Sequence, residues 1–237
     1  MQQIILKMSL QHNSITADYN RAVLSYIKSA IQTYNSEIFE SWFGREKTKR
    51  KSYTFSVLFP QPQFGKGRIK LSEARFTIYL SAYNLTEYII LYNALLEKRN
   101  IWYPFGDNKL LLLDLVTAKI PFISGTSMLV KADSPILVRK HSPDNQDKYL
   151  TFENEGFSEA ILETIQCATD GLDIPTAGFF IEPVQPKKTV IYHYGMCVNA
   201  NIGIYKVDGG PELLNYLLLS GIGAATNSGH GKIHAVC

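Results

Sequence analysis

Apolar and polar positions in the first half of the chain follow two different periods. Residues 3–10 place Ile4, Leu6 and Met8 on one face of a half-buried strand. Apolar residues then recur at every fourth position from Tyr19 to Ile31, which predicts an amphipathic helix. The remaining pattern predicts a short helix at 36–43, strands at 53–59 and 68–80, a helix at 86–98, and strands at 110–115 and 119–123.

The pattern restarts in the second half of the chain. It predicts strands at 127–130 and 136–140, a helix at 158–167, long strands across 189–207, a helix at 211–219 and a last strand at 232–236. Each half approximates the β-α-β-β-α-β order of a ferredoxin-like unit. We therefore predict an α+β protein of two tandem ferredoxin-like (RRM-like) units, with an N-terminal domain at 1–120 and a C-terminal domain at 121–237.

Composition narrows the class of protein. The 237 residues are 46% hydrophobic, enough for a sizeable core, and the net charge of +3 is too small to indicate nucleic acid by itself. Cys167, Cys197 and Cys237 are unclustered, which argues against a disulfide framework or a zinc site. We see no signal peptide and no apolar run that would span a bilayer, so we expect a cytoplasmic protein without membrane association.

A glycine-rich stretch, GIGAATNSGHGKIHA, occupies residues 221–235. A P-loop would need Gly where Thr226 stands and Ser or Thr where Ile233 stands, and a dinucleotide fingerprint would need a third Gly at Thr226. Both motifs also open a helix, which this stretch does not. The stretch predicts either a flexible loop whose amides meet an anion or a Gly-rich hairpin with no ligand.

Several phrases, in order along the chain, resemble the CRISPR repeat-processing endoribonucleases of the RAMP (repeat-associated) superfamily. They are YNRAVLSYI from residue 19, KSYTFSVL from residue 51, DSPILVRK from residue 133, YLTF from residue 149, and the glycine-rich stretch itself. In that family the glycine-rich loop lies against the RNA backbone.

The resemblance implies a metal-independent endoribonuclease that binds CRISPR repeat RNA and cleaves the precursor transcript into guide RNAs. A 2′-hydroxyl attacks the adjacent phosphate and leaves a 2′,3′-cyclic phosphate, so no cofactor or metal is expected. One alternative is a catalytically inactive RAMP subunit that holds guide RNA in a CRISPR effector complex. Another is a ferredoxin-like enzyme for a small phosphorylated substrate. A monomer or a homodimer fits each of these.

The candidate catalytic residues depart from the family pattern. The family's usual His falls on Phe43, and no His lies between His12 and His141. Lys28 takes the place of the family's first-helix Tyr, with Tyr26 two residues earlier, whereas Lys51 matches directly. Either the reaction uses lysines, or another His has taken over, or the protein binds without cutting. The candidates for catalysis are Lys51, Tyr26, Lys28, His230 and His12.

The candidate RNA-binding residues form three groups. The basic run between the second helix and the next strand predicts a phosphate-contacting patch, although a solvated charge run is the alternative. The glycine-rich loop is the second group, and we expect His230 to be exposed there. A polar loop near residue 141 is the third. The residues are Arg45, Lys47, Lys49 and Arg50; Gly221, Gly223, Asn227, Ser228, Gly229, Gly231 and Lys232; and Lys140 with His141.

Overall fold

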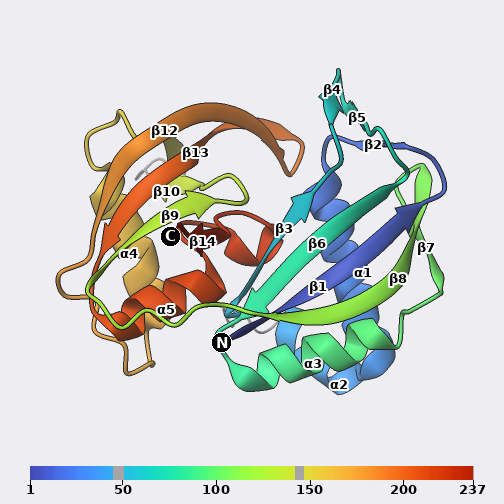
Figure 1. Cartoon of the computed structure of the whole chain (residues 1–237), viewed down its shortest axis with the longest axis horizontal. Helices are drawn as coiled ribbons and strands as arrows, with labels where there is room; N and C mark the ends of the chain where they lie inside the picture. The colour runs from blue at the N-terminus through green and yellow to red at the C-terminus, as the bar shows by residue number, and fades with distance from the viewer. Residues whose placement is uncertain (45–50, 142–146, 237) are drawn as a thin grey trace. The chain divides into compact units, whose positions relative to one another are not determined.

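The computed structural model describes residues 1–44, 51–141 and 147–236. Internal contacts divide the chain into an N-terminal unit, Gln2–Lys119, and a C-terminal unit, Ile120–Cys237 together with Met1 (Figure 1). Across the described residues, we find no helix that combines the length and apolar character needed to cross a membrane.

The N-terminal unit is built on an antiparallel sheet. Its strand order is β3 (Tyr53–Leu58), β6 (Arg75–Ala82), β1 (Gln2–Leu10), β8 (Asn108–Lys119) and β7 (Trp102–Phe105). The helices are α1 (Tyr19–Tyr34), α2 (Ser36–Phe43) and α3 (Leu85–Leu96). Ile4, Leu6 and Met8 are buried against the apolar stripe of α1, as the alternation predicts. The other face of β1 carries Lys7.

A small second sheet sits beside the N-terminal one, with the order β2 (Ser14–Thr16), β5 (Arg68–Lys70) and β4 (Gln63–Phe64). The prediction of one strand over 68–80 is wrong, because the chain leaves β5 and turns before β6. The turn is held by the Leu10 amide, which donates to the Ala74 carbonyl at 2.8 Å, and by the Leu71 amide, which donates to the Asn13 carbonyl at 2.8 Å.

The C-terminal unit has a sheet with the order β12 (Phe180–His193), β13 (Met196–Asp208), β9 (Ser127–Ala132) and β14 (Ile233–Ala235). Helices α4 (Phe157–Thr169) and α5 (Pro211–Ser220) share its core. A hairpin of β10 (Val138–Lys140) and β11 (Lys148–Leu150) and a short 3₁₀ turn, η1 (Thr226–Ser228), complete the unit. The predicted strand at 119–123 is absent, because β8 continues to Lys119 and the Ile123 amide donates instead to Asn215 Oδ1 at 3.0 Å.

The two main sheets repeat one topology. In each, the third strand of the β-α-β-β-α-β order lies between the first and the second, and the fourth pairs with the other edge of the first. Strand β7 is an addition to the N-terminal sheet. The predicted α+β class with two ferredoxin-like units is confirmed.

The glycine-rich loop closes tightly on its own unit. Gly231 donates its amide to the Pro135 carbonyl at 2.9 Å, and its φ of +65° lies in the left-handed region. A Cβ at this position would lie 1.9 Å from the Ile222 carbonyl oxygen. Only glycine fits this approach of two backbone segments.

We predict that Gly231→Ala destabilises the protein by about 2 kcal/mol or more, because the new Cβ collides with backbone at a strained φ. Gly178→Ala is the matched control, since Gly178 also has a positive φ, of +76°, but open space around its Cβ position. That control should cost only about 1 kcal/mol. Urea unfolding of both variants measures the difference, and equal losses would contradict the close approach.

Candidate functional site

Two lysine side chains of the N-terminal unit converge on one aromatic ring. The Nζ of Lys51 lies 4.6 Å from the centroid of the Phe43 ring, and the Nζ of Lys28 lies 4.9 Å from the same centroid. Lys28 comes from α1, Phe43 ends α2, and Lys51 precedes β3. An aromatic ring attracts cations, so Phe43 favours both ammonium groups near it. The Lys28 charge also acts on Lys51. We call Lys28, Phe43 and Lys51 the lysine pair site.

The end of α2 explains the position of Phe43. Asn35 caps the helix, and its side-chain oxygen accepts the amides of Glu37 and Ile38, both at 2.9 Å. The helix stops at Gly44, whose amide donates to the Glu40 carbonyl at 2.9 Å. A Cβ on Gly44 would lie 2.4 Å from that carbonyl oxygen, so the sequence places a glycine directly after Phe43.

Glu87 on α3 holds the backbone next to Lys51. Ser52 donates its amide and its hydroxyl to Oε2 of Glu87, at 2.7 and 2.8 Å. The Asn84 amide donates to the Ser52 hydroxyl oxygen at 2.9 Å, and the Asn84 side chain caps α3 by accepting the Glu87 amide at 3.1 Å. Charge-assisted bonds of this kind fix the start of β3 against the start of α3.

A pocket of about 270 Å³ opens beside this anchor. Its lining mixes the Lys51 ammonium, the Glu87 carboxylate and hydroxyl or amide groups with the ring of Trp42; the residues are Ser41, Trp42, Lys51, Asn84, Thr86, Glu87 and Ile90. Trp42 stacks on Tyr53 with ring centroids 6.4 Å apart. The pocket therefore combines a cation and hydrogen-bonding groups with the ring of Trp42, which packs on Tyr53.

The surroundings of Lys51 favour its neutral form. Partial burial lowers the pKa of Lys51 below its ordinary value of 10.5, and the Lys28 charge lowers it further, while the Glu87 carboxylate opposes both. Lys51 is therefore closer to losing its proton at physiological pH than a solvated lysine would be.

Tyr26 and His12, which we predicted as catalytic candidates, lie elsewhere in the N-terminal unit. Tyr26 is 0% exposed in the core, and burial raises the pKa of its phenol, so it is a packing residue. His12 follows the end of β1, where its amide donates to Asn108 Oδ1 at 3.2 Å and its carbonyl accepts from Asn108 Nδ2 at 2.8 Å. The strand register puts Lys51 at the opposite end of the sheet, so the structure does not bring His12 to the lysine pair site.

The expectation of an exposed His230 is wrong. His230 is 1% exposed, and its Nε2 lies 3.1 Å from Nδ1 of His193. Burial first, and then the His193 charge, lowers the pKa of His230 to about 3, so the ring is neutral at physiological pH. Lys232 is also buried, at 2% exposure, and burial lowers its pKa to about 8.

Much of the glycine-rich loop is buried in its own unit, which disfavours the first of the two predicted alternatives, a flexible loop whose amides meet an anion. Several of its amides donate within the C-terminal unit: Ile222 to the Gly231 carbonyl at 2.8 Å, Ala224 to the Leu137 carbonyl at 2.8 Å, and Lys232 to the Ser134 hydroxyl at 2.9 Å. Gly221, Gly223, Gly229 and Gly231 are buried, whereas Asn227 and Ser228 of η1 are partly exposed. The glycines therefore set the backbone shape of the loop, and Asn227 and Ser228 supply its partly exposed surface.

The other predicted RNA-binding residues are divided between exposed positions and positions outside the described residues. Lys140 and His141 are exposed, and His141 Nδ1 lies 2.7 Å from Asp147 Oδ1. Arg45, Lys47, Lys49 and Arg50 lie outside the described residues. Sequence reasoning missed Phe43 as the platform and Glu87 as the anchor. The resemblance described above would place Phe43 where the family carries a His, which was a usable signal, whereas nothing in the sequence marks Glu87.

The comparisons with known proteins identify the family. Residues 118–235 match the family model described as CRISPR associated protein Cas6, C-terminal. The chain belongs to the Cas6 family. No curated protein sequence matches it.

Solved structures of this group resemble the whole chain. A structure described as a RAMP protein binding different RNA substrates superposes with a TM-score of 0.84 at 17% identity, covering 100% of both chains. The product of a Cas6-related gene from Pyrococcus furiosus gives 0.85 at 20% identity, covering 99% of this chain and 98% of that one. A Cas6 product complex gives 0.71 at 14% identity, with 99% of each chain covered. At these identities the likeness establishes the fold of this Cas6-type protein.

The two charged neighbours of Lys51, removed one at a time, should shift the pKa of Lys51 in opposite directions. Lys28→Gln removes a positive charge and raises the pKa of Lys51, whereas Glu87→Gln removes a negative charge and lowers it. NMR titration of the Lys51 side chain measures both. Shifts in the same direction would contradict this electrostatic account.

Proposed function

We propose that this Cas6-type protein binds CRISPR repeat RNA and cleaves the precursor transcript into guide RNAs through the lysine pair site. The observation that carries the proposal is the convergence of the Lys51 and Lys28 ammonium groups on Phe43, beside a polar pocket. RNA supplies its own nucleophile, so the protein needs to move two protons and stabilise a phosphorane. No step of this scheme requires a metal or a cofactor.

The lowered pKa of Lys51 suits it to the first proton transfer. Its neutral fraction takes the proton of the 2′-hydroxyl, the 2′-oxygen bonds to phosphorus, and the bond to the 5′-oxygen breaks. The Lys28 ammonium stabilises the charge on the phosphorane and donates a proton to the leaving 5′-oxygen. The products are a 2′,3′-cyclic phosphate and a 5′-hydroxyl.

In this proposal the two predicted domains have different roles, one in catalysis and one in RNA binding. Domain 1–120 supplies the lysines. Domain 121–237 contacts the RNA through Asn227 and Ser228 of η1, which are partly exposed, and through the exposed Lys140 and His141. The basic run at 45–50 adjoins Lys51 in sequence and contacts phosphates. The glycines hold the loop in shape, and buried Lys232 makes no phosphate contact.

A second candidate function is favoured by Phe43, which stands where the family carries a His and cannot transfer a proton. On this alternative the protein is an inactive subunit that retains guide RNA in an effector complex. Incubation of the protein with a repeat transcript in excess EDTA decides between the two. A product with a cyclic-phosphate end supports the nuclease, whereas binding without cleavage supports the subunit.

Lys51→Ala should slow single-turnover cleavage by about 10²–10⁴-fold, because it removes the general base. Repeat affinity should fall much less, since one phosphate contact among several is lost. His12→Ala and His230→Ala are the controls, and each should keep most of the rate. If either His variant abolishes cleavage while Lys51→Ala does not, that histidine is the general base and Lys51 is not.

The cleavage rate should rise with pH above 7, because neutral Lys51 is the reactive form. It should level off as the pH passes the pKa of Lys51, which lies below 10.5. In Lys28→Gln the rising limb should move to higher pH, because the pKa of Lys51 rises. A pH–rate profile that is flat from 6 to 9, or one unmoved by Lys28→Gln, would exclude Lys51 as the base.

A further inference from the structure

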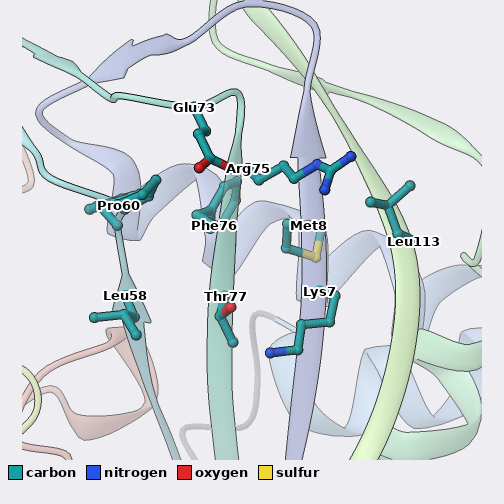
Figure 2. A pocket seen from close by; sticks show the side chains of 10 residues that line it. Lys7, Met8, Leu58, Pro60, Glu73, Arg75, Phe76, Thr77 and Leu113 are labelled. Carbon is teal, nitrogen blue, oxygen red and sulfur yellow. The ribbon is translucent and has the colours of Figure 1, made fainter.

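A groove of about 470 Å³ lies on the face of the N-terminal sheet away from the helices. Leu58, Thr77 and Lys7 occupy neighbouring strands in one cross-strand row, and Figure 2 shows their side chains on the same face. Arg75 lies two residues before Thr77 on β6. Leu113 is the extra residue of a β-bulge in β8 and closes the far side. The volume is that of a small-ligand site.

The groove combines apolar walls with two positively charged side chains. Leu58, Phe59 and Leu113 supply the apolar surface, and Lys7 and Arg75 supply the cations. Asp114, which faces Lys7 across the strands, is paired with Arg99 at 3.3 Å. Glu73 is the one acidic residue in the lining. This chemistry matches a nucleobase with its phosphates better than it matches a cation or a purely apolar ligand.

A basic hairpin, residues 61–70, projects from the rim of the groove. Its two ends are joined where the Ser72 amide and hydroxyl donate to the Pro60 carbonyl, at 3.2 and 3.3 Å. Phe64 is 75% exposed, the highest exposure of any large apolar side chain in the described residues. Lys66 and Lys70 are exposed and make no ion pair with described residues, and the hairpin contains no acidic residue.

Packing and hydrogen bonds hold the hairpin in place. Ile69 is buried opposite Ile15 of β2, and the Ala17 amide donates to the Gly67 carbonyl at 3.0 Å. Arg68 is paired with Asp107, so its charge is used within the protein. Because the hairpin that carries Phe64 is already fixed in place, a ligand that binds to this ring should cost the protein little conformational entropy.

We propose that the groove and the basic hairpin together bind a single-stranded segment of the RNA. An unpaired base stacks on Phe64, and phosphates meet Lys66, Lys70, Lys7 and Arg75. A single strand is specified because an exposed aromatic ring stacks only on unpaired bases, and side chains do not enter the narrow major groove of an RNA duplex. The inference rests on the proposed RNA-binding function and adds the region and the form of RNA that it recognises.

The sheet geometry separates this surface from the lysine pair site. Strand β3 runs from beside Lys51 to Leu58, a span of roughly 20 Å at about 3.3 Å per residue. The bound segment therefore lies several nucleotides from the scissile phosphate. Contacts there should raise affinity without changing the chemical step at saturation.

The test compares Phe64→Ala and the double variant Lys66→Gln/Lys70→Gln with Phe122→Ala and Lys119→Gln. Phe122 is 68% exposed and Lys119 is also exposed, and both lie outside the groove and hairpin, so they control for loss of a surface aromatic or lysine. For each protein, affinity for repeat RNA is measured by fluorescence anisotropy over a salt series. Single-turnover cleavage is measured at saturating protein.

Phe64→Ala should weaken binding by about 5- to 150-fold, the loss measured when one stacking platform is removed. The double lysine variant should reduce the slope of log affinity against log salt by about 1.4, or about 0.7 for each phosphate contact. Neither variant should change the saturated cleavage rate by more than about twofold. Repeats made fully double-stranded should bind wild type and Phe64→Ala equally.

Failure of this inference is distinguishable from failure of the proposed function. Wild type that neither binds nor cleaves repeat RNA refutes the proposed function and the inference with it. Wild type that binds, with Phe64→Ala and the lysine variant behaving as the two controls do, refutes the inference alone and leaves the hairpin to a protein partner. Slower cleavage at saturation also refutes it, since the surface would then act on the chemical step.

Discussion

The geometry of the lysine pair site depends on the two hydrogen bonds from Ser52 to the Glu87 carboxylate. These bonds tie the first residues of β3 to the first turn of α3, which are far apart in sequence. Lys51 is one residue from the tie, so its backbone has little freedom, and its long side chain is directed by the ring of Phe43. One carboxylate thus sets the position of Lys51, and its charge opposes the lowering of the Lys51 pKa by burial and by Lys28.

A phenyl ring in place of an imidazole changes what the site can do. A His at position 43 would exchange protons near neutral pH. Phe43 exchanges none, but its ring attracts both ammonium groups, which lie 4.6 and 4.9 Å from its centroid. Partial burial and the Lys28 charge lower the pKa of Lys51, which brings its neutral form closer to physiological pH. A lysine with a lowered pKa is better suited to accept a proton than a solvated one.

The alternation and the four-residue spacing predicted all five helices of the described chain and most strands of the two main sheets, because local periodicity records which side faces the core. They missed β7 and the first half of β12. The same rule, applied further, excludes Tyr26, which lies three residues after buried Val23 and shares its face of α1. Lys28, two residues later, falls on another face. The convergence of Lys28 and Lys51 was not predictable, since it depends on Glu87 and on where α2 ends.

The glycine-rich loop shows why a motif predicts architecture more securely than ligand contact. Its spacing of glycines is explained by backbone approaches within the C-terminal unit, at Gly223 against the Leu137 carbonyl and at Gly231 against the Ile222 carbonyl. At both positions a Cβ would collide with a backbone carbonyl, so only glycine fits. The same approaches consume several amides that an anion would need. Where folding already explains a motif's residues, recognition of RNA has to be sought in neighbouring side chains, here the partly exposed Asn227 and Ser228 of η1.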